Sequence, residues 1–164
     1  MSTFENDRYQ WRETYFVLFP AARRPTLKQV AARLAALSNR YTLENPAGDE
    51  EGMFESVTVV SPDDFAALDV CYTGGDEVLE HGQELSQELA ATIEPEQRPL
   101  LKRIKQMDGR FDVLHFEQVE AADESDGDEL LDPSTLLAVM EDLARITDGI
   151  AIDPQSGTIF NTDA

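Results

Sequence analysis

Cysteine is almost absent from this sequence, and its scarcity excludes several kinds of protein. Cys71 is the single thiol, so neither an internal disulfide nor a cysteine-rich zinc site can form. No apolar run approaches the length of about 20 residues that a membrane-spanning helix needs. The first eleven residues are polar and include Glu5 and Asp7, which is unlike a signal peptide. These absences predict a cytoplasmic protein with no membrane segment.

Basic residues are also scarce, with 13 Lys and Arg against 33 Asp and Glu and a formal net charge of −20. A charge of that sign opposes bulk binding to nucleic acid or to an anionic membrane. The imbalance is uneven, because residues 1–40 hold seven bases and three acids whereas residues 41–164 hold six bases and thirty acids. The acidity suits a basic protein partner and suits solubility in salty surroundings equally well.

The length of 164 residues, 41% of them hydrophobic, is that of a single domain with a core. We therefore expect residues 1–164 to form one α+β domain. A polar N-terminal arm is predicted at residues 1–13. An acidic flexible loop is predicted at residues 120–132, which carry seven acids and no base.

Apolar periodicity predicts the helices and strands. Residues 14–19 are continuously apolar, which indicates a central strand buried on both faces. Thr26 and Gln29 match a capping box at the start of a helix that ends near Asn39. Further strands are predicted at 41–44, 53–60, 68–73, 111–119, 150–153 and 158–160, and further helices at 76–93 and 133–146.

This order of elements favours an α+β fold, with a mainly antiparallel sheet and helices packed on one face. The opening strand–helix–strand–strand is compatible with a ferredoxin-like arrangement. Gly82 lies in the apolar stripe of its helix, where close approach of a neighbouring element would offset the roughly 1 kcal/mol that glycine costs relative to alanine. Gly149 is expected in the left-handed conformation after the last helix.

Two short segments resemble parts of uncharacterised bacterial domain families. They are the opening Tyr15 to Pro20 (YFVLFP) and the closing Gly149 to Phe160 (GIAIDPQSGTIF), which together cover under a quarter of the chain. The resemblance implies a small bacterial domain of unknown function and assigns no catalytic residue.

A candidate anion site lies at the start of the first helix. Arg23 and Arg24 precede the helix and Lys28 lies in its first turn, where free backbone N–H groups and arginine side chains favour an anion. The segment lacks the glycines of a P-loop. The competing interpretation, which we favour, is that these bases pair with the protein's own carboxylates.

A candidate metal site lies on the helix predicted at 76–93. Glu77, His81 and Glu84 are spaced so that all three face one direction, and such a set can hold a divalent cation. A solvated, charged helix face is the competing and favoured interpretation. His115 and Glu117 share a strand face and could form an acid–base pair, although side chains that are neighbours on a sheet need not react. Cys71 lies in an apolar strand, where burial favours an inert thiol over a nucleophile.

The sequence therefore predicts a non-enzymatic interaction or regulatory domain that binds a basic protein partner through its acidic surface, with no cofactor. The alternative is an anion- or nucleotide-binding sensor, or a small enzyme, that uses Arg23, Arg24 and Lys28. A third hypothesis is a metal-dependent activity around His81.

Overall fold

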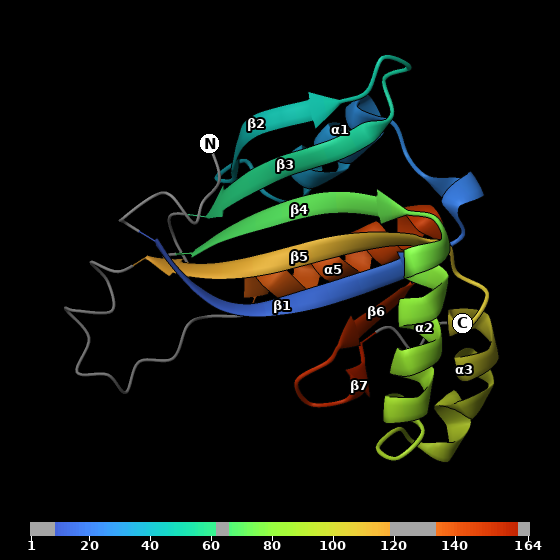
Figure 1. Cartoon of the computed structure of the whole chain (residues 1–164). Coiled ribbons are helices and arrows are strands. Elements are labelled where there is room, and N and C mark those ends of the chain that lie inside the picture. Colours follow the sequence, from blue (N-terminus) through green and yellow to red (C-terminus); the bar gives the residue numbers. More distant parts are fainter. Residues whose placement is uncertain (1–8, 62–65, 119–133, 161–164) are drawn as a thin grey trace, which may run out of the picture.

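The computed structural model describes residues 9–61, 66–118 and 134–160, which form one sheet with helices against it (Figure 1). The strands are β1 (Tyr9–Phe19), β2 (Thr42–Gly48), β3 (Phe54–Ser61), β4 (Ala66–Gly74), β5 (Gly109–Gln118), β6 (Ile150–Asp153) and β7 (Thr158–Ile159). The α-helices are α1 (Leu27–Leu37), α2 (Asp76–Leu89), α3 (Arg98–Ile104) and α5 (Ser134–Thr147), and the short 3-10 turns are η2 (Ala21–Arg23) and η4 (Pro95–Gln97).

Within the described residues the sheet has seven strands, in the order β2-β3-β4-β5-β1-β6-β7. All of its strand pairs are antiparallel. Strand β1 lies between β5 and β6, so the first strand of the chain joins the β2–β5 half of the sheet to the C-terminal hairpin. The α+β class and the antiparallel sheet predicted from the sequence are confirmed.

Strand β1 is buried on both faces, as its continuous apolar run predicts. Val17 pairs with Ala151, and both belong to the core under α1 and α5. Leu18 pairs with Ile150, and both belong to a second core under α2 and α3. Successive residues of a strand point to opposite faces, so these two cores lie on opposite sides of the sheet.

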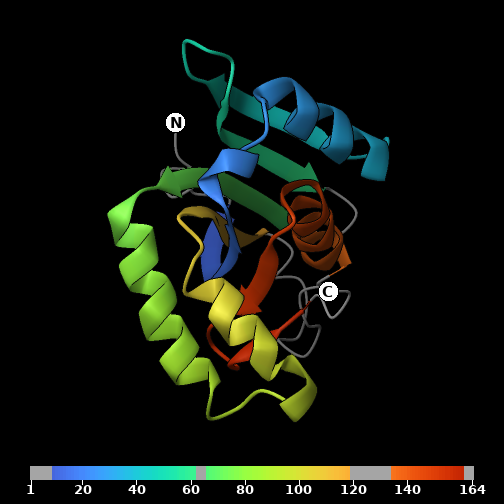
Figure 2. The same cartoon turned by 90° about the vertical axis from the view of Figure 1, so that its right-hand side faces the viewer.

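The helices accordingly cover both faces, which corrects the expectation that they pack on one. Figure 2 shows α1 and α5 on one side of the sheet and α2 on the other. The centre of the sheet fits the ferredoxin-like expectation, because β1, β4, β5 and β6 lie in the order β4-β5-β1-β6 with antiparallel neighbours, and α1 and α5 pack on the same face. The additions to this pattern are β2 and β3, which lie between α1 and β4 in the chain, and α2 and α3, which lie between β4 and β5.

Three local expectations change with the structure. Strand β1 begins at Tyr9, so residues 9–13 of the predicted arm belong to the sheet. The left-handed residue after α5 is Asp148, with φ of 53°, and the following Gly149 is needed for space, because a Cβ there would lie 2.6 Å from the carbonyl oxygen of Leu18. The predicted acidic loop at 120–132 lies outside the described residues.

The two margins of the sheet differ from its centre. Strand β2 contains Pro46, has Asn45 at φ of 52°, and shifts register against β3 on both sides of Ala47. At the opposite margin, β7 is only two residues long. Among the helices that the structure describes, none is long and apolar enough to cross a membrane.

Candidate functional site

Arg24, one of the three bases of the predicted anion site, is held by the β2–β3 hairpin. Its Nη1 lies 3.3 Å from Oδ2 of Asp49, and its Nε and Nη2 donate to the carbonyl oxygen of Phe54 over 3.1 and 2.8 Å. The guanidinium also lies over the ring of Tyr72, 4.1 Å from its centroid. These contacts tie the start of α1 to the hairpin, so Arg24 has a structural role.

The start of α1 is already capped. The predicted capping box is confirmed, because the backbone N–H of Gln29 donates to Thr26 Oγ1 over 3.1 Å and the Gln29 side chain accepts from the N–H of Thr26 over 2.9 Å. The N–H of Leu27 donates to the carbonyl oxygen of Gly52 over 2.9 Å. The backbone N–H groups of Thr26, Leu27 and Gln29 at this helix end therefore already have acceptors.

The structure does not assemble the predicted anion site from Arg23, Arg24 and Lys28. A pocket of about 460 Å³ does lie beside η2 and α1, and Arg23 and Arg24 line it. Lys28 is exposed and is not part of the lining. Its place is taken by Gln29 and Arg33, further along the same helix.

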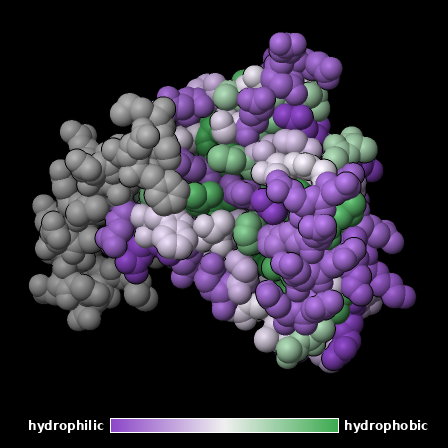
Figure 3. All heavy atoms as spheres, viewed as in Figure 1, coloured by the Kyte–Doolittle hydropathy of each residue, from purple (hydrophilic) through white to green (hydrophobic). Residues whose placement is uncertain are grey.

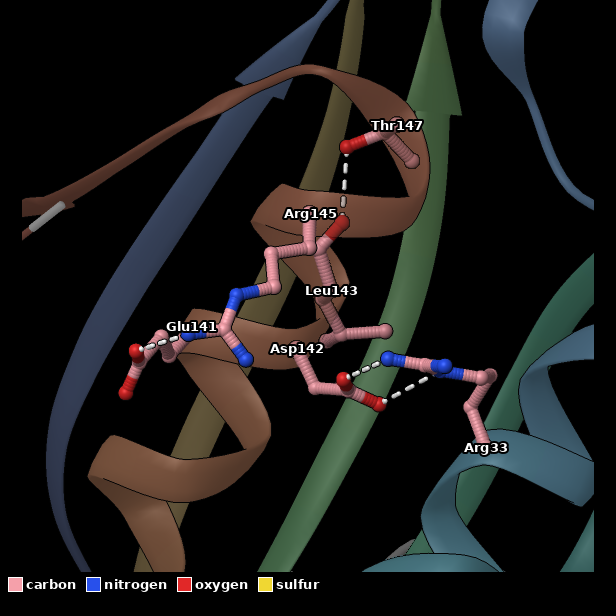
Figure 4. Close-up of polar contacts among 6 residues, drawn as sticks. All are labelled: Arg33, Glu141, Asp142, Leu143, Arg145 and Thr147. Atoms are coloured by element: carbon pink, nitrogen blue, oxygen red, sulfur yellow. Dashed lines mark hydrogen bonds and ion pairs between the residues drawn. The ribbon is translucent and has the colours of Figure 1, made fainter. Parts of the chain in front are cut away.

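Arg33 crosses from α1 to α5 and grips Asp142 (Figure 4). Its Nε donates to Asp142 Oδ2 over 3.1 Å, and its Nη2 donates to Oδ1. The Asp142 carboxylate is 5% exposed whereas Arg33 is half-exposed, so the pair forms at the edge of the core. The parallel two-point contact fixes the plane of the guanidinium.

Arg33 and Asp142 were not among the candidate residues predicted from the sequence. The sequence did contain a sign of this pair, because Asp142 is a carboxylate between the apolar residues Met140 and Leu143 of α5. A buried carboxylate needs a cation or several donors, which would have prompted a search for a distant arginine.

The predicted metal site is not formed. His81 Nδ1 lies 3.0 Å from Nη1 of Arg110, and the rings of His81 and Phe16 form a T-shaped pair with centroids 4.7 Å apart. Glu77 and Glu84 extend into solvent, and the described part of the chain contains no group of three or more side chains placed to hold a metal ion. The His81 ring nitrogen that could have bound a metal ion therefore contacts the guanidinium of Arg110 instead.

Burial and the charge of Arg110 together favour the neutral form of His81. Burial is the largest cause that lowers the pKa of His81, and the charge of Arg110 lowers it further. Arg110 is itself aligned by Asp112, to which its Nε donates. Because a guanidinium can only donate, Nδ1 accepts and the neutral ring carries its proton on Nε2.

His115 and Glu117 share a face of β5, as predicted, but do not form an acid–base site. His115 is buried in the sheet, 4% exposed. Glu117 pairs with Arg12 of β1, with Nε and Oε2 3.3 Å apart. The pairing serves the contact between β1 and β5.

Cys71 is expected to react slowly with alkylating reagents. Burial, with smaller effects of Asp69 and Asp112, raises the pKa of the Cys71 thiol to about 11. The thiolate is the reactive form, so at pH 8 we expect iodoacetamide to modify Cys71 about 100-fold more slowly than a thiol of pKa 9. Mass spectrometry of timed samples measures the rate. Asp69→Asn should accelerate it, and a rate equal to that of a small free thiol would contradict the expectation.

Comparison with known proteins finds no matching family model, no similar curated protein and no similar solved structure.

Proposed function

We propose that this chain is a binding module, without chemistry of its own, whose acidic surface docks a basic protein partner. The observation that carries the proposal is the outer face of α2. The helix contains no lysine or arginine and bears five carboxylates, namely Asp76, Glu77, Glu80, Glu84 and Glu88. Figure 3 shows hydrophilic side chains gathered over this part of the surface. We call these five residues the α2 acidic face.

The α2 acidic face is left uncompensated by the protein itself. The ion pairs of the described residues join arginines to carboxylates that lie outside α2. None of them involves a carboxylate of α2. Six of the ten arginines in the sequence are used in those pairs, all with carboxylates outside α2.

The spacing of these glutamates opposes folding. Glu80, Glu84 and Glu88 follow one another at four-residue intervals, where like charges destabilise a helix by about 0.2–0.5 kcal/mol per pair. Glu88 also lies near the C-terminal end of α2, where the helix dipole disfavours a negative charge. A cationic partner would relieve both effects, and this supports a role for the face in binding.

The α2 acidic face adjoins a half-exposed surface of the sheet. His81, on the same helix, contacts Phe16 of β1 and Arg110 of β5. Beside them Leu114 of β5, which pairs with Asp69 of β4, is only partly buried. A partner with basic groups flanking an apolar side chain could contact both surfaces, with the charges steering its approach.

The proposal predicts that neutralising α2 weakens binding of a basic peptide. A decalysine peptide is the probe, and its affinity is measured by calorimetry in 50 mM and 500 mM NaCl. The triple variant Glu80→Gln, Glu84→Gln, Glu88→Gln should bind at least about tenfold more weakly than the unaltered chain at low salt, because three contacting charges are removed. High salt should also weaken the binding of decalysine to the unaltered chain, because exposed charges are screened.

A matched control removes the same charge elsewhere. Glu50, Glu51 and Glu55 are exposed on and beside the β2–β3 hairpin, and their replacement by glutamine should leave the affinity within about twofold. The α2 variant should also be at least as stable as the unaltered chain, since like-charge repulsion is removed. Equal losses in the two triple variants would show that only net charge matters, and would overturn the assignment to α2.

A further inference from the structure

We infer that the pocket between η2, α1 and the C-terminal end of α5 binds a small organic anion that has an apolar body. We call it the arginine pocket. Its volume of about 460 Å³ lies within the range of about 300–1,000 Å³ that is typical of small-molecule sites. It lies on the side of the sheet covered by α1 and α5, opposite α2, so the inference stands apart from the proposed protein-binding surface.

The charged side chains that line the arginine pocket are all cationic. Arg23, Arg24 and Arg33 contribute guanidinium groups, and Gln29 contributes an amide. Among the residues that the structure describes, no carboxylate belongs to the lining, although acids outnumber bases 33 to 13 in the sequence. A cavity with this lining in so acidic a protein selects a negatively charged occupant.

The three arginines differ in how much of their charge is already compensated. Arg24 and Arg33 are held by Asp49 and Asp142, and neither carboxylate belongs to the pocket lining. Arg23 is exposed and has no side-chain partner among the residues that the structure describes. Arg23 therefore supplies the free charge for an anion.

Arg33 supplies donors that are already oriented. Asp142 accepts from Nε and from Nη2, and a guanidinium has five N–H groups, so Nη1 and one N–H of Nη2 remain. Because the buried carboxylate fixes the plane of the group, less side-chain entropy is lost when a ligand binds. An anion between Arg23 and Arg33 would receive hydrogen bonds from both.

The remaining residues that line the arginine pocket are apolar, and they indicate that the rest of the ligand is apolar. Ala22 and Pro25 come from the segment before α1, Ala32 from α1, and Ile146 from the end of α5. An inorganic ion would leave these side chains uncovered, whereas a ligand with a short hydrocarbon or aromatic body would cover them. The ligand that fits this lining is therefore an organic phosphate or carboxylate with one apolar portion.

The test uses phenyl phosphate as the probe, titrated into the full-length chain in 150 mM NaCl. Binding is followed by the backbone amide signals in NMR spectra. We expect saturable shifts centred on Ala22, Arg23 and Ile146, and at least tenfold weaker binding of inorganic phosphate. Saturation elsewhere on the protein, or equal affinity for the two probes, would overturn the inference.

Matched variants locate the ligand. Arg23→Gln should weaken phenyl phosphate binding at least fivefold, whereas Arg98→Gln, which removes an exposed arginine of α3, should change it less than twofold. Ala32→Phe should abolish binding by filling the arginine pocket. Ala35→Phe places the same ring at another exposed position of α1 and should bind normally. Equal effects within either pair would overturn the inference.

Discussion

Replacing Phe111 with alanine is expected to lower the free energy of unfolding by about 3–5 kcal/mol, because a fully buried phenyl ring is lost and a cavity remains. Phe111 is 0% exposed on β5. Its ring lies 4.6 Å from the ring of Phe19 and 5.5 Å from that of Phe54, centroid to centroid, so it joins β1 and β3 through β5. Urea denaturation followed by circular dichroism measures the change.

Two further variants complete the test of Phe111. Phe111→Leu keeps most of the apolar volume, and we expect a loss smaller than that of the alanine variant. Leu137 lies on α5 with 43% of its surface exposed, and its replacement by alanine should change stability by no more than about 0.5 kcal/mol. Comparable losses at Phe111 and Leu137 would contradict the location of the core.

Replacing Gly82 with alanine should destabilise the protein by about 1–3 kcal/mol, although helix propensity alone favours alanine by roughly 1 kcal/mol. A Cβ at this position of α2 would lie 2.7 Å from the carbonyl oxygen of Ile104 at the end of α3. The contacting atom belongs to the backbone, so α2 and α3 would have to separate. Thermal unfolding measures the change in stability. A loss shows that the close packing of α2 on α3 outweighs helix propensity, and a gain shows the reverse.

The adjacent position provides the control for Gly82. Gln83 is exposed on the same turn of α2, and Gln83→Ala should leave stability unchanged within about 0.5 kcal/mol. If Gly82→Ala were stabilising, α2 and α3 would not be in the close contact described. Gly82→Val would then also be tolerated, whereas the close contact predicts a larger loss for valine than for alanine.

Local patterns predicted the features of the fold that depend on neighbouring residues. The capping box at Thr26 and Gln29 and the close approach at Gly82 both follow from side-chain chemistry at one place in the chain. The helix placement was wrong because an apolar stripe shows that a helix is covered without showing by which face of the sheet. The two-sided burial predicted for residues 14–19 already required cover on both faces.

The candidate sites depended on partners that are distant in the sequence. Arg24 is bound by Asp49 and Phe54, and Arg33 is bound by Asp142, 109 residues away. Any of these arginines could have paired with many of the 33 acids, and spacing along a helix cannot choose among them. The sequence thus located a basic segment but could not say which of its charges remain free.

The two margins of the sheet limit how this protein can join other chains. An incoming strand needs a straight row of free backbone N–H and C=O groups. Pro46 lacks one of those donors, and the irregular backbone around Ala47 breaks the row on β2, while β7 offers only the length of Thr158 and Ile159. Contacts with other molecules are therefore left to side chains, and the sheet is protected against the edge-to-edge growth that leads to fibrils.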